Sequence, residues 1–343
     1  MLRTLRARLS HRARLALDFT PWGGRSTQAR RARRARDRRE QAERSPDRPF
    51  VIELPDLTGR ALRPVYLDRL GRYATATSVK LLDRETLVCA SFLEKKLYLI
   101  RFDATRRTWS MLDEIASTFR GVPVETDLAD VDPSGTQIVL SNFHHGGFTH
   151  FRRVGDRLEW VQDLPSGFDC KVHGVKFFDA EVVAGTLCTT PTGVVLFSLS
   201  KGRPILRIDV AEKAQDVAFS SREELIVLAV RGAPRRERQA TYASEISRVR
   251  FDLARGSSAV VGTRCFPDAH FDACALHDGR LFLTDQRNDR VEVLDAATLE
   301  RVARIGGYDF PHGIDVRFGL LAVSNYGCNT LDLRALSAIE LGQ

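Results

Sequence analysis

Residues 280–333 read RLFLTDQRNDRVEVLDAATLERVARIGGYDFPHGIDVRFGLLAVSNYGCNTLDL. This stretch contains two short apolar runs, RLFLTD and LLAVSN, and each is followed by a polar turn and a second, alternating run. Bounded runs of this length that are rich in Leu and Val are typical of strands buried on both faces. The segment therefore predicts antiparallel strands joined by short turns.

The same pattern recurs along the chain. Further copies of the strongest strand are TLVCAS (86–91), QIVLSN (137–142), EVVAGT (181–186) and ELIVLAV (224–230). An apolar anchor lies 11–13 residues before the end of each copy, and the anchors, 40–57 residues apart, are Val79, Val131, Val175, Val217, Cys274 and Ile314. Six units of four strands predict an all-β fold, a six-bladed β-propeller over residues 49–343.

The two ends of the chain suggest how the ring closes. Residues 50–56 (FVIELPD) form one more predicted strand, whereas the last unit has only SAIELGQ (337–343) as a candidate for its fourth strand. A ring is best protected when one terminus adds a strand to the blade that contains the other. We therefore expect the strand near Phe50 to join the last blade.

The last two units also resemble known repeats. Their rhythm of strand, Asn or Asp, polar turn, strand ending in Asp, and Pro-x-Gly is similar to that of YVTN-repeat and NHL-type propellers. This resemblance implies a fold shared by lactonases, gluconolactonase/regucalcin-like hydrolases and many non-catalytic binders. A fold of this kind does not by itself fix a function.

The net charge of +8 is unevenly distributed. Residues 1–48 contain 15 arginines and five acids, a net charge of +10, and residues 49–343 carry a net charge of −2. We interpret residues 1–48 as a disordered or partly helical extension that the core does not need, so that its deletion leaves the melting temperature nearly unchanged. Residues 1–17 have the pattern of a basic amphipathic helix, which could place residues 1–20 on an anionic membrane surface or serve as an organellar presequence. The arginine run lacks aromatic residues, which argues against nucleic acid as a partner.

Composition also limits the compartment. No stretch approaches the roughly 20 apolar residues of a membrane span, and the six widely separated cysteines are typical of reduced thiols. We expect a cytoplasmic monomer, with an organellar or membrane-peripheral location through the basic helix as the alternative.

Propeller geometry brings two sets of residues to one mouth of the channel. The residues two positions before each anchor begin the inner strands; they are Thr77, Ala129, His173, Gln215, Asp272 and His312. The loops after the second strands contribute the candidate ligand-binding residues Asn142, His144, His145, Arg231, Arg235, Asp285, Asn325 and Tyr326. A concave, loop-lined mouth on a rigid scaffold is the expected place for a ligand.

Three interpretations of this mouth remain open. Carboxylates such as Asp130, Asp216 and Asp272 could hold calcium, as the resemblance to gluconolactonase-like propellers implies, although His173 and His312 stand where those enzymes have asparagine. Alternatively, His173 and His312 bind another divalent metal, act as a catalytic acid–base pair, or only hydrogen-bond the backbone. In the third interpretation the mouth binds a small, anionic ligand or a partner protein without catalysis, helped by Arg231 and Arg235.

Overall fold

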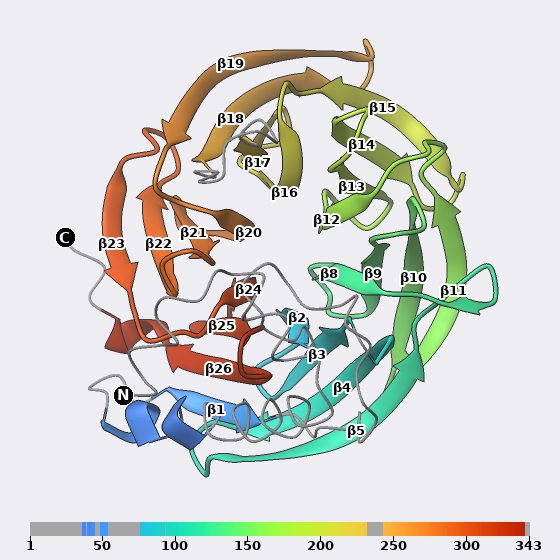
Figure 1. Cartoon of the computed structure of the whole chain (residues 1–343). Helices are drawn as coiled ribbons and strands as arrows, with labels where there is room; N and C mark the ends of the chain where they lie inside the picture. The colour runs from blue at the N-terminus through green and yellow to red at the C-terminus, as the bar shows by residue number, and fades with distance from the viewer. Residues whose placement is uncertain are drawn as a thin grey trace, which may run out of the picture.

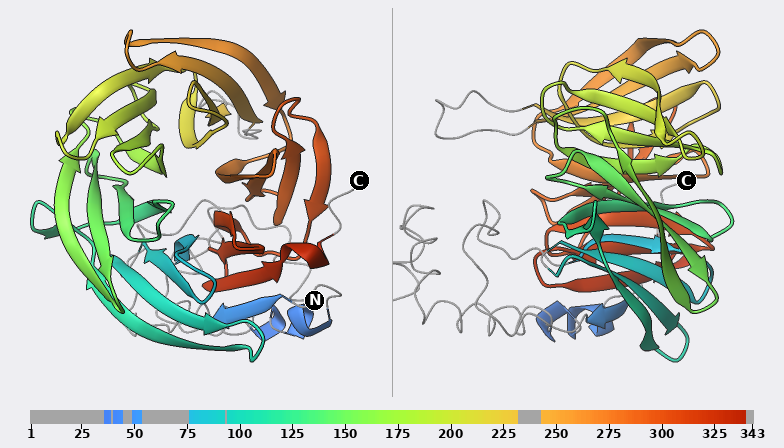
Figure 2. Two further views of the ribbon diagram at one scale, coloured as in Figure 1. Left: turned by 180° about the vertical axis from the view of Figure 1, so that it is seen from behind. Right: turned by 90° about the vertical axis from the view of Figure 1, so that its right-hand side faces the viewer.

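The computed structural model describes residues 36–38, 40–44, 49–53, 76–92, 94–231 and 243–339. Six four-stranded antiparallel sheets are arranged around a central axis, and the described strands form a disc when seen from the side (Figures 1 and 2). The predicted six-bladed propeller is confirmed.

Each blade is named here by its order along the chain. The innermost strands are β2 (Ala76–Leu81), β8 (Thr126–Val131), β12 (Val172–Phe177), β16 (Lys213–Phe219), β20 (Phe271–His277) and β24 (Pro311–Arg317). The second strands are β3 (Thr86–Ser91), β9 (Gln137–Asn142), β13 (Val182–Leu187), β17 (Glu224–Arg231), β21 (Arg280–Asp285) and β25 (Leu320–Asn325). These second strands agree with the predicted runs to within one residue at either end.

The remaining two strands complete each blade. The third strands are β4 (Lys96–Asp103), β10 (Gly147–Val154), β14 (Gly193–Ser198), β18 (Ala243–Asp252), β22 (Arg290–Asp295) and β26 (Thr330–Ala335). The outer strands are β5 (Thr108–Ala116), β11 (Arg157–Pro165), β15 (Arg203–Asp209), β19 (Ser257–Phe266), β23 (Arg301–Ile305) and β1 (Phe50–Glu53). A short hairpin of β6 (Thr118–Phe119) and β7 (Val122–Pro123) precedes blade two, and a 3₁₀ turn, η2 (Leu336–Ala338), follows β26.

The core lies between neighbouring blades. All six residues of β3 and of β13 are buried, as their unbroken apolar runs require. One cluster joins Leu228 of blade four to Leu281 and Leu283 of blade five, and similar clusters occur at the other blade contacts. Burial of each such side chain stabilises the fold by about 1.5–3 kcal/mol. The inner ends of the blades are thereby held rigidly around the channel.

The outer strands of blades one to five share a β-bulge. In each, one residue is skipped in the pairing with the third strand, for example Val161 between Trp160 and Gln162, and Val261 between Val260 and Gly262. Bulges twist an exposed edge away from further pairing. They explain how the rim can carry partly exposed apolar residues such as Trp160 and Val260.

The ring is closed by the N-terminal strand, as expected. β1 pairs with β26, with Phe50 opposite Leu333, so that blade six has the order β1-β26-β25-β24. The alternative fourth strand, SAIELGQ, is wrong for its described part, because Leu336–Ala338 forms the 3₁₀ turn. Its last residues, 340–343, lie outside the described residues.

Part of the arginine-rich extension packs on blade six. Residues 36–38 and 40–44 are helical, and Arg38 and Ala42 are buried. Nε of Arg38 donates to Oδ2 of Asp332 at 2.8 Å, and the guanidinium lies over the ring of Tyr308. A buried ion pair between segments 294 residues apart ties this helix to the closing blade, so we no longer expect deletion of residues 1–48 to be neutral. The amphipathic helix predicted over residues 1–17 and its proposed membrane contact over 1–20 lie outside the described residues.

Two further expectations from composition can be compared with the structure. All six cysteines are free thiols, and all except Cys265 are buried. Within the described residues no helix is long and apolar enough to cross a membrane.

Candidate functional site: a histidine–carboxylate cluster in the channel

All six inner strands begin with the same irregularity. In β12, Val172 pairs with Leu187 and Val175 with Gly185, so that two residues, His173 and Gly174, face the single residue Thr186 of β13. Equivalent bulges occur in the other five inner strands. A bulge re-aims a side chain. The first bulged residues of blades one to six are Thr77, Asp127, His173, Gln215, Asp272 and His312.

This register corrects one prediction. In blade two, Ala129 pairs with Leu140 as Val175 pairs with Gly185, so Ala129 and not Val131 is the anchor. The residue that occupies the mouth position of blade two is therefore Asp127, two residues before the predicted Ala129. The error arose because the apolar pattern of TDLADV fits either register.

Four of the bulged side chains form a cluster. Nε2 of His173 lies 3.4 Å from Oδ2 of Asp127 and 3.5 Å from Oδ1 of Asp272. Nε2 of His312 lies 3.3 Å from Oδ1 of Asp127 and 3.1 Å from Oδ2 of Asp272. The two imidazole rings are 5.7 Å apart between centroids. Each carboxylate thus contacts both histidines through different oxygens, and all four residues are buried.

The histidines are oriented by the blade that follows each of them. Nδ1 of His173 lies 2.8 Å from the carbonyl oxygen of Gln215, and Nδ1 of His312 lies 2.8 Å from that of Thr77. A carbonyl can only accept, so Nδ1 carries the proton and Nε2 faces the cluster. The backbone hydrogen bonds predicted for His173 and His312 are confirmed. They fix the orientation of both rings and leave Nε2 of each ring to face the cluster.

Glycines make this close approach feasible. A Cβ on residue 174 would lie 2.6 Å from the carbonyl oxygen of Gln215, and one on residue 313 would lie 2.7 Å from that of Thr77. The His-Gly pairs seen in the sequence therefore have a steric reason: the residue after each histidine touches the backbone of the next blade.

Hydroxyl side chains opposite the bulges complete the framework. Thr186 accepts a hydrogen bond from the amide of Gly174 and donates to the carbonyl of Gln215, and Thr284 bridges Ala273 and His312 in the same way. Ser141 likewise accepts from the amide of Leu128 and donates to the carbonyl of His173. The bulge amides are thus satisfied and neighbouring blades are joined at the level of the cluster.

Burial changes the proton affinities of the four groups. Burial raises the pKa of Asp127, and raises that of Asp272 to about 7. Burial opposes protonation of His173, but the charges of Asp127 and Asp272 outweigh it and raise the pKa. Burial and the charge of His173 lower the pKa of His312 well below its usual value. The two carboxylates thus attract a proton or another cation into this desolvated place.

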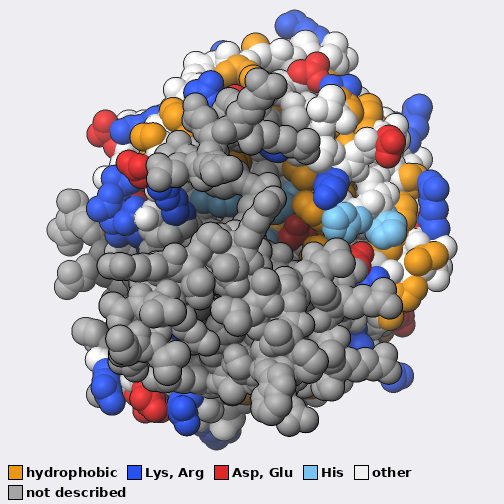
Figure 3. Space-filling model, viewed as in Figure 1, with side chains coloured by type: hydrophobic (Ala, Val, Ile, Leu, Met, Phe, Trp, Pro, Cys, Tyr) orange, Lys and Arg blue, Asp and Glu red, His pale blue; other side chains and the backbone are white. Residues whose placement is uncertain are grey.

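Aromatic rings border the cluster. Tyr326 stacks on His312 with ring centroids 4.9 Å apart, and Phe143 meets the ring of His173 edge-on at 6.0 Å. Nζ of Lys171 lies 4.8 Å from the centre of Phe143, and His144 packs on the same ring. On this face, histidine and acidic side chains are visible in the hollow near the centre of the ring (Figure 3). The cluster thus has apolar walls and a nearby cation.

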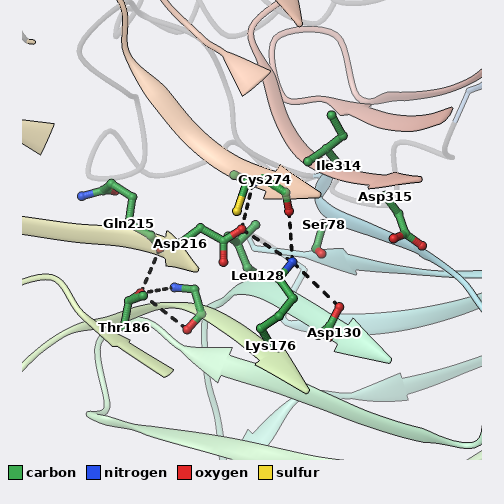
Figure 4. A network of polar contacts seen from close by, with 12 residues as sticks. Ser78, Leu128, Asp130, Lys176, Thr186, Gln215, Asp216, Cys274, Ile314 and Asp315 are labelled. Atoms are coloured by element: carbon green, nitrogen blue, oxygen red, sulfur yellow. Dashed lines mark hydrogen bonds and ion pairs between the residues drawn. The ribbon is translucent and has the colours of Figure 1, made fainter. Parts of the chain in front are cut away.

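A second layer of charged side chains crosses the channel further along the inner strands, beyond the cluster as seen from the mouth. Nζ of Lys176 lies 4.0 Å from Oδ1 of Asp130 and 3.8 Å from Oδ2 of Asp216, and it donates to the carbonyl of Cys274 in blade five (Figure 4). Arg317 of blade six reaches the carbonyl of Val131 in blade two at 2.8 Å. Because these side chains span the channel, the cluster lies above a charged floor.

The floor is compensated within itself. Lys80 contacts Asp130 at 3.4 Å and donates to the carbonyl of Ile314, while Asp315 contacts Arg317 at 3.5 Å. Three carboxylates also accept backbone amides of neighbouring blades: Asp130 from Phe177, Asp216 from Cys274 and Asp315 from Leu81. Burial, which opposes ionisation, is outweighed by the nearby cations, led by Lys176, so the pKa of Asp130 is lowered.

The structure therefore separates the predicted metal residues. Asp272 lies in the cluster, whereas Asp130 and Asp216 are in the floor with lysine partners. The residue that sequence reasoning missed is Asp127. The charged residues Lys80, Lys176 and Arg317 were also missed, although a lysine inside an apolar strand is a signal that could have found the first two.

The predicted loop residues mostly serve the turns. The side chain of Asn142 donates to Thr149, Asp285 accepts the amide of His270, and Asn325 accepts the amide of Asp309. His145 lies 3.9 Å from Glu125, and Arg231 is half exposed and paired with Glu212 and Glu245. Arg235 lies outside the described residues. Among the members of this set that the structure describes, Tyr326 is the one that lies against the cluster.

The fold and the site together define a six-bladed propeller with a buried histidine–carboxylate cluster at the channel mouth. No family model matches the sequence, and no curated protein matches it. Among solved structures, the chain is similar to a chain of Kuenenia stuttgartiensis hydrazine synthase at 13% identity, with a TM-score of 0.57 over 83% of this chain and 100% of that one. It is also similar to U3-55K at 10% identity, with a TM-score of 0.53 over 77% and 96% of the two chains. At these identities the likeness shows the fold alone.

Proposed function

We propose that this propeller is a binding protein that holds a small ligand at its channel mouth, seated on Asp127, His173, Asp272 and His312. The observation that carries the proposal is the convergence of four buried ionisable side chains from four blades above a charged floor. Buried carboxylates are costly unless they are paired, and binding proteins often place a few polar groups in an apolar-walled recess.

The surroundings suggest the kind of ligand. Phe143 and Tyr326 offer aromatic contact, and Lys171 adds a positive charge that suits an anionic group. Arg231 gives this less support than expected, because two glutamates already pair with it. The blade rhythm supports a place among YVTN- or NHL-type propellers as part of the same proposal.

A thermal-shift panel tests the proposal. The probes are acetate, gluconate, citrate, inorganic phosphate and divalent cations, applied to the wild type, to a variant with Asp127→Asn and Asp272→Asn, and to Asp156→Asn. Asp156 is an exposed acid paired with Arg101 and serves as the matched control. We expect at least one probe to stabilise the wild type and the control but not the double variant. Equal shifts in all three proteins would refute binding at this cluster.

A second candidate function is hydrolysis of a lactone or ester. It is favoured by the donor types themselves, because histidine and carboxylate are the side chains of hydrolytic metal centres. γ-Butyrolactone and p-nitrophenyl acetate are suitable probes. Turnover that disappears in the double variant and persists in Asp156→Asn would support this candidate; turnover that is equal in all three proteins would exclude it.

A further inference from the structure

We propose that the cluster is a metal site in which His173, His312 and Asp127, with Asp272 beside them, hold one divalent transition-metal ion of the zinc or cobalt type. This inference rests on the proposed function, since it names the ligand class of the same recess. Donor atoms of Asp127, His173 and His312 lie within 4.8 Å of one another, and Asp272 is within 3.5 Å of both histidines.

The distances between donors agree with ligation of a common ion. Metal–ligand bonds of about 2.1 Å place neighbouring donors about 3.0 Å apart in octahedral geometry and about 3.4 Å apart in tetrahedral geometry. The four Nε2–carboxylate distances are 3.1, 3.3, 3.4 and 3.5 Å. One donor atom each of Asp127, His173 and His312 forms the compact set that could share an ion, and Asp272 contacts both histidines beside it.

Direct hydrogen bonds are a poorer account of these contacts. Oδ2 of Asp272 lies 3.1 Å from Nε2 of His312, yet within the described part of the chain this buried oxygen accepts no hydrogen bond. A buried carboxylate oxygen without a partner costs free energy. It is explained if both the oxygen and the imidazole nitrogen are directed at an ion between them.

The orientation of the histidines is that of metal ligands. Each imidazole presents Nε2 to the cluster because its Nδ1 donates to a backbone carbonyl, from Gln215 in one case and Thr77 in the other. This second hydrogen bond fixes the tautomer and the ring, as is usual for ligating histidines. The nearby glycines, Gly174 and Gly313, allow both carbonyls to approach.

Charge and donor type select the ion. Two carboxylates and two neutral imidazoles need two positive charges for neutrality, which a divalent ion supplies. Calcium and magnesium prefer oxygen ligands, whereas two imidazole nitrogens together with carboxylate oxygen suit zinc, cobalt, manganese or iron. The acids of the floor do not compete, since Asp130 and Asp216 are already neutralised by Lys80 and Lys176.

Cobalt binding to the full, untagged chain tests the proposal. After dialysis against a chelator, the protein is titrated with Co²⁺ and with Zn²⁺ by calorimetry, and the bound metal is measured by mass spectrometry. We expect one ion per chain and a visible Co²⁺ absorption of nitrogen and oxygen ligation. Less than a fifth of an equivalent at saturating metal, or a cysteine-to-cobalt charge-transfer band, would overturn the assignment without any variant.

Variants then locate the ion. The double variant Asp127→Asn/Asp272→Asn, and the single variants His173→Gln and His312→Gln, are expected to bind Co²⁺ at least 100-fold more weakly. The matched control is His277→Gln/Asp278→Asn, which removes an exposed His–Asp pair 3.3 Å apart and should change the affinity less than threefold. Wild-type affinity in the cluster variants would overturn the proposal. If metal fails to bind while an organic probe of the thermal-shift panel still depends on the cluster, the proposed function stands and the metal site falls; if neither binds, both fall.

Discussion

Replacement of Gly174 by alanine should loosen the cluster through a single methyl group. The new Cβ would lie 2.5 Å from Oδ1 of Asp216, 2.6 Å from the carbonyl oxygen of Gln215 and 2.7 Å from Cα of Asp216. Contacts under 3.0 Å are essentially never seen for real Cβ atoms, and two of the three atoms belong to backbone. Blade four must therefore move away from blade three. The carbonyl that is pushed is the acceptor for Nδ1 of His173 at 2.8 Å, so the same movement weakens the bond that orients this ring.

The expected cost combines these effects. Overpacking of this kind costs about 1–3 kcal/mol, and weakening a buried hydrogen bond adds about 1 kcal/mol. Alanine also lowers the conformational entropy of the unfolded chain, which offsets the destabilisation by about 0.4–1 kcal/mol. The free energy of unfolding should fall by about 2–3 kcal/mol, measured by urea denaturation with tryptophan fluorescence, and Co²⁺ affinity should fall with it.

Gly306→Ala is the matched control, because nothing lies within 4 Å of its added Cβ. Its stability should be unchanged or slightly higher than that of the wild type. A Gly174→Ala protein that unfolds within 0.5 kcal/mol of this control (roughly the additive error of such measurements) and binds Co²⁺ as the wild type does would refute the steric argument.

Three further predictions follow from the charged groups. First, burial raises the pKa of Asp272 to about 7 from 3.8, so the folded, chelator-treated protein retains a proton that the unfolded chain releases, and stability falls as pH rises from about 4 to 7. Asp272→Asn should therefore gain up to about 4 kcal/mol on the wild type between pH 4 and pH 8 in urea titrations, and a constant difference would contradict this. Second, Lys176→Met leaves Asp130 and Asp216 short of a cation and should cost about 3–5 kcal/mol, partly recovered by adding Asp216→Asn, while Lys201→Met on the exposed surface should be neutral. Third, Arg38→Gln should lower stability by about 3 kcal/mol because buried Asp332 loses the nearer of its two arginine partners, whereas the exposed Arg36→Gln should not; equal melting curves would show that the N-terminal helix is dispensable.

The fold could be predicted because its signal is repeated. Each second strand is a bounded apolar run, and six copies at similar spacing overdetermine the architecture even where one copy, such as EVVAGT, is shifted by a residue. Ring closure by the strand at Phe50 was predictable for a different reason: an unpaired edge in the last blade needs a partner.

The site was predictable only in part, since it depends on register rather than on composition. His173, Asp272 and His312 were placed correctly at the mouth because their blades carry a clear anchor. Asp127 was missed because TDLADV offers an apolar residue at both Ala129 and Val131, so the anchor of β8 was placed two residues too late, and an apolar pattern alone does not distinguish these registers. The docking of Arg38 could not be predicted at all, as a single arginine among 15 in the extension carries no local signal.

The two buried layers of the channel differ in the partners of their carboxylates, and this difference distinguishes the charged floor from the candidate site. In the lower layer Asp130, Asp216 and Asp315 each accept a backbone amide and lie against Lys80, Lys176 or Arg317, so the charges balance without help. In the upper layer the ion pairs of Asp127 and Asp272 among the described residues are with the two histidines, whose rings are already fixed through Nδ1. The carboxylates of both layers are buried to a similar degree, but those of the upper layer have imidazoles rather than lysine or arginine as their charged partners. The proposed metal ion would supply a positive charge to the upper layer, and for that reason we place the proposed function there.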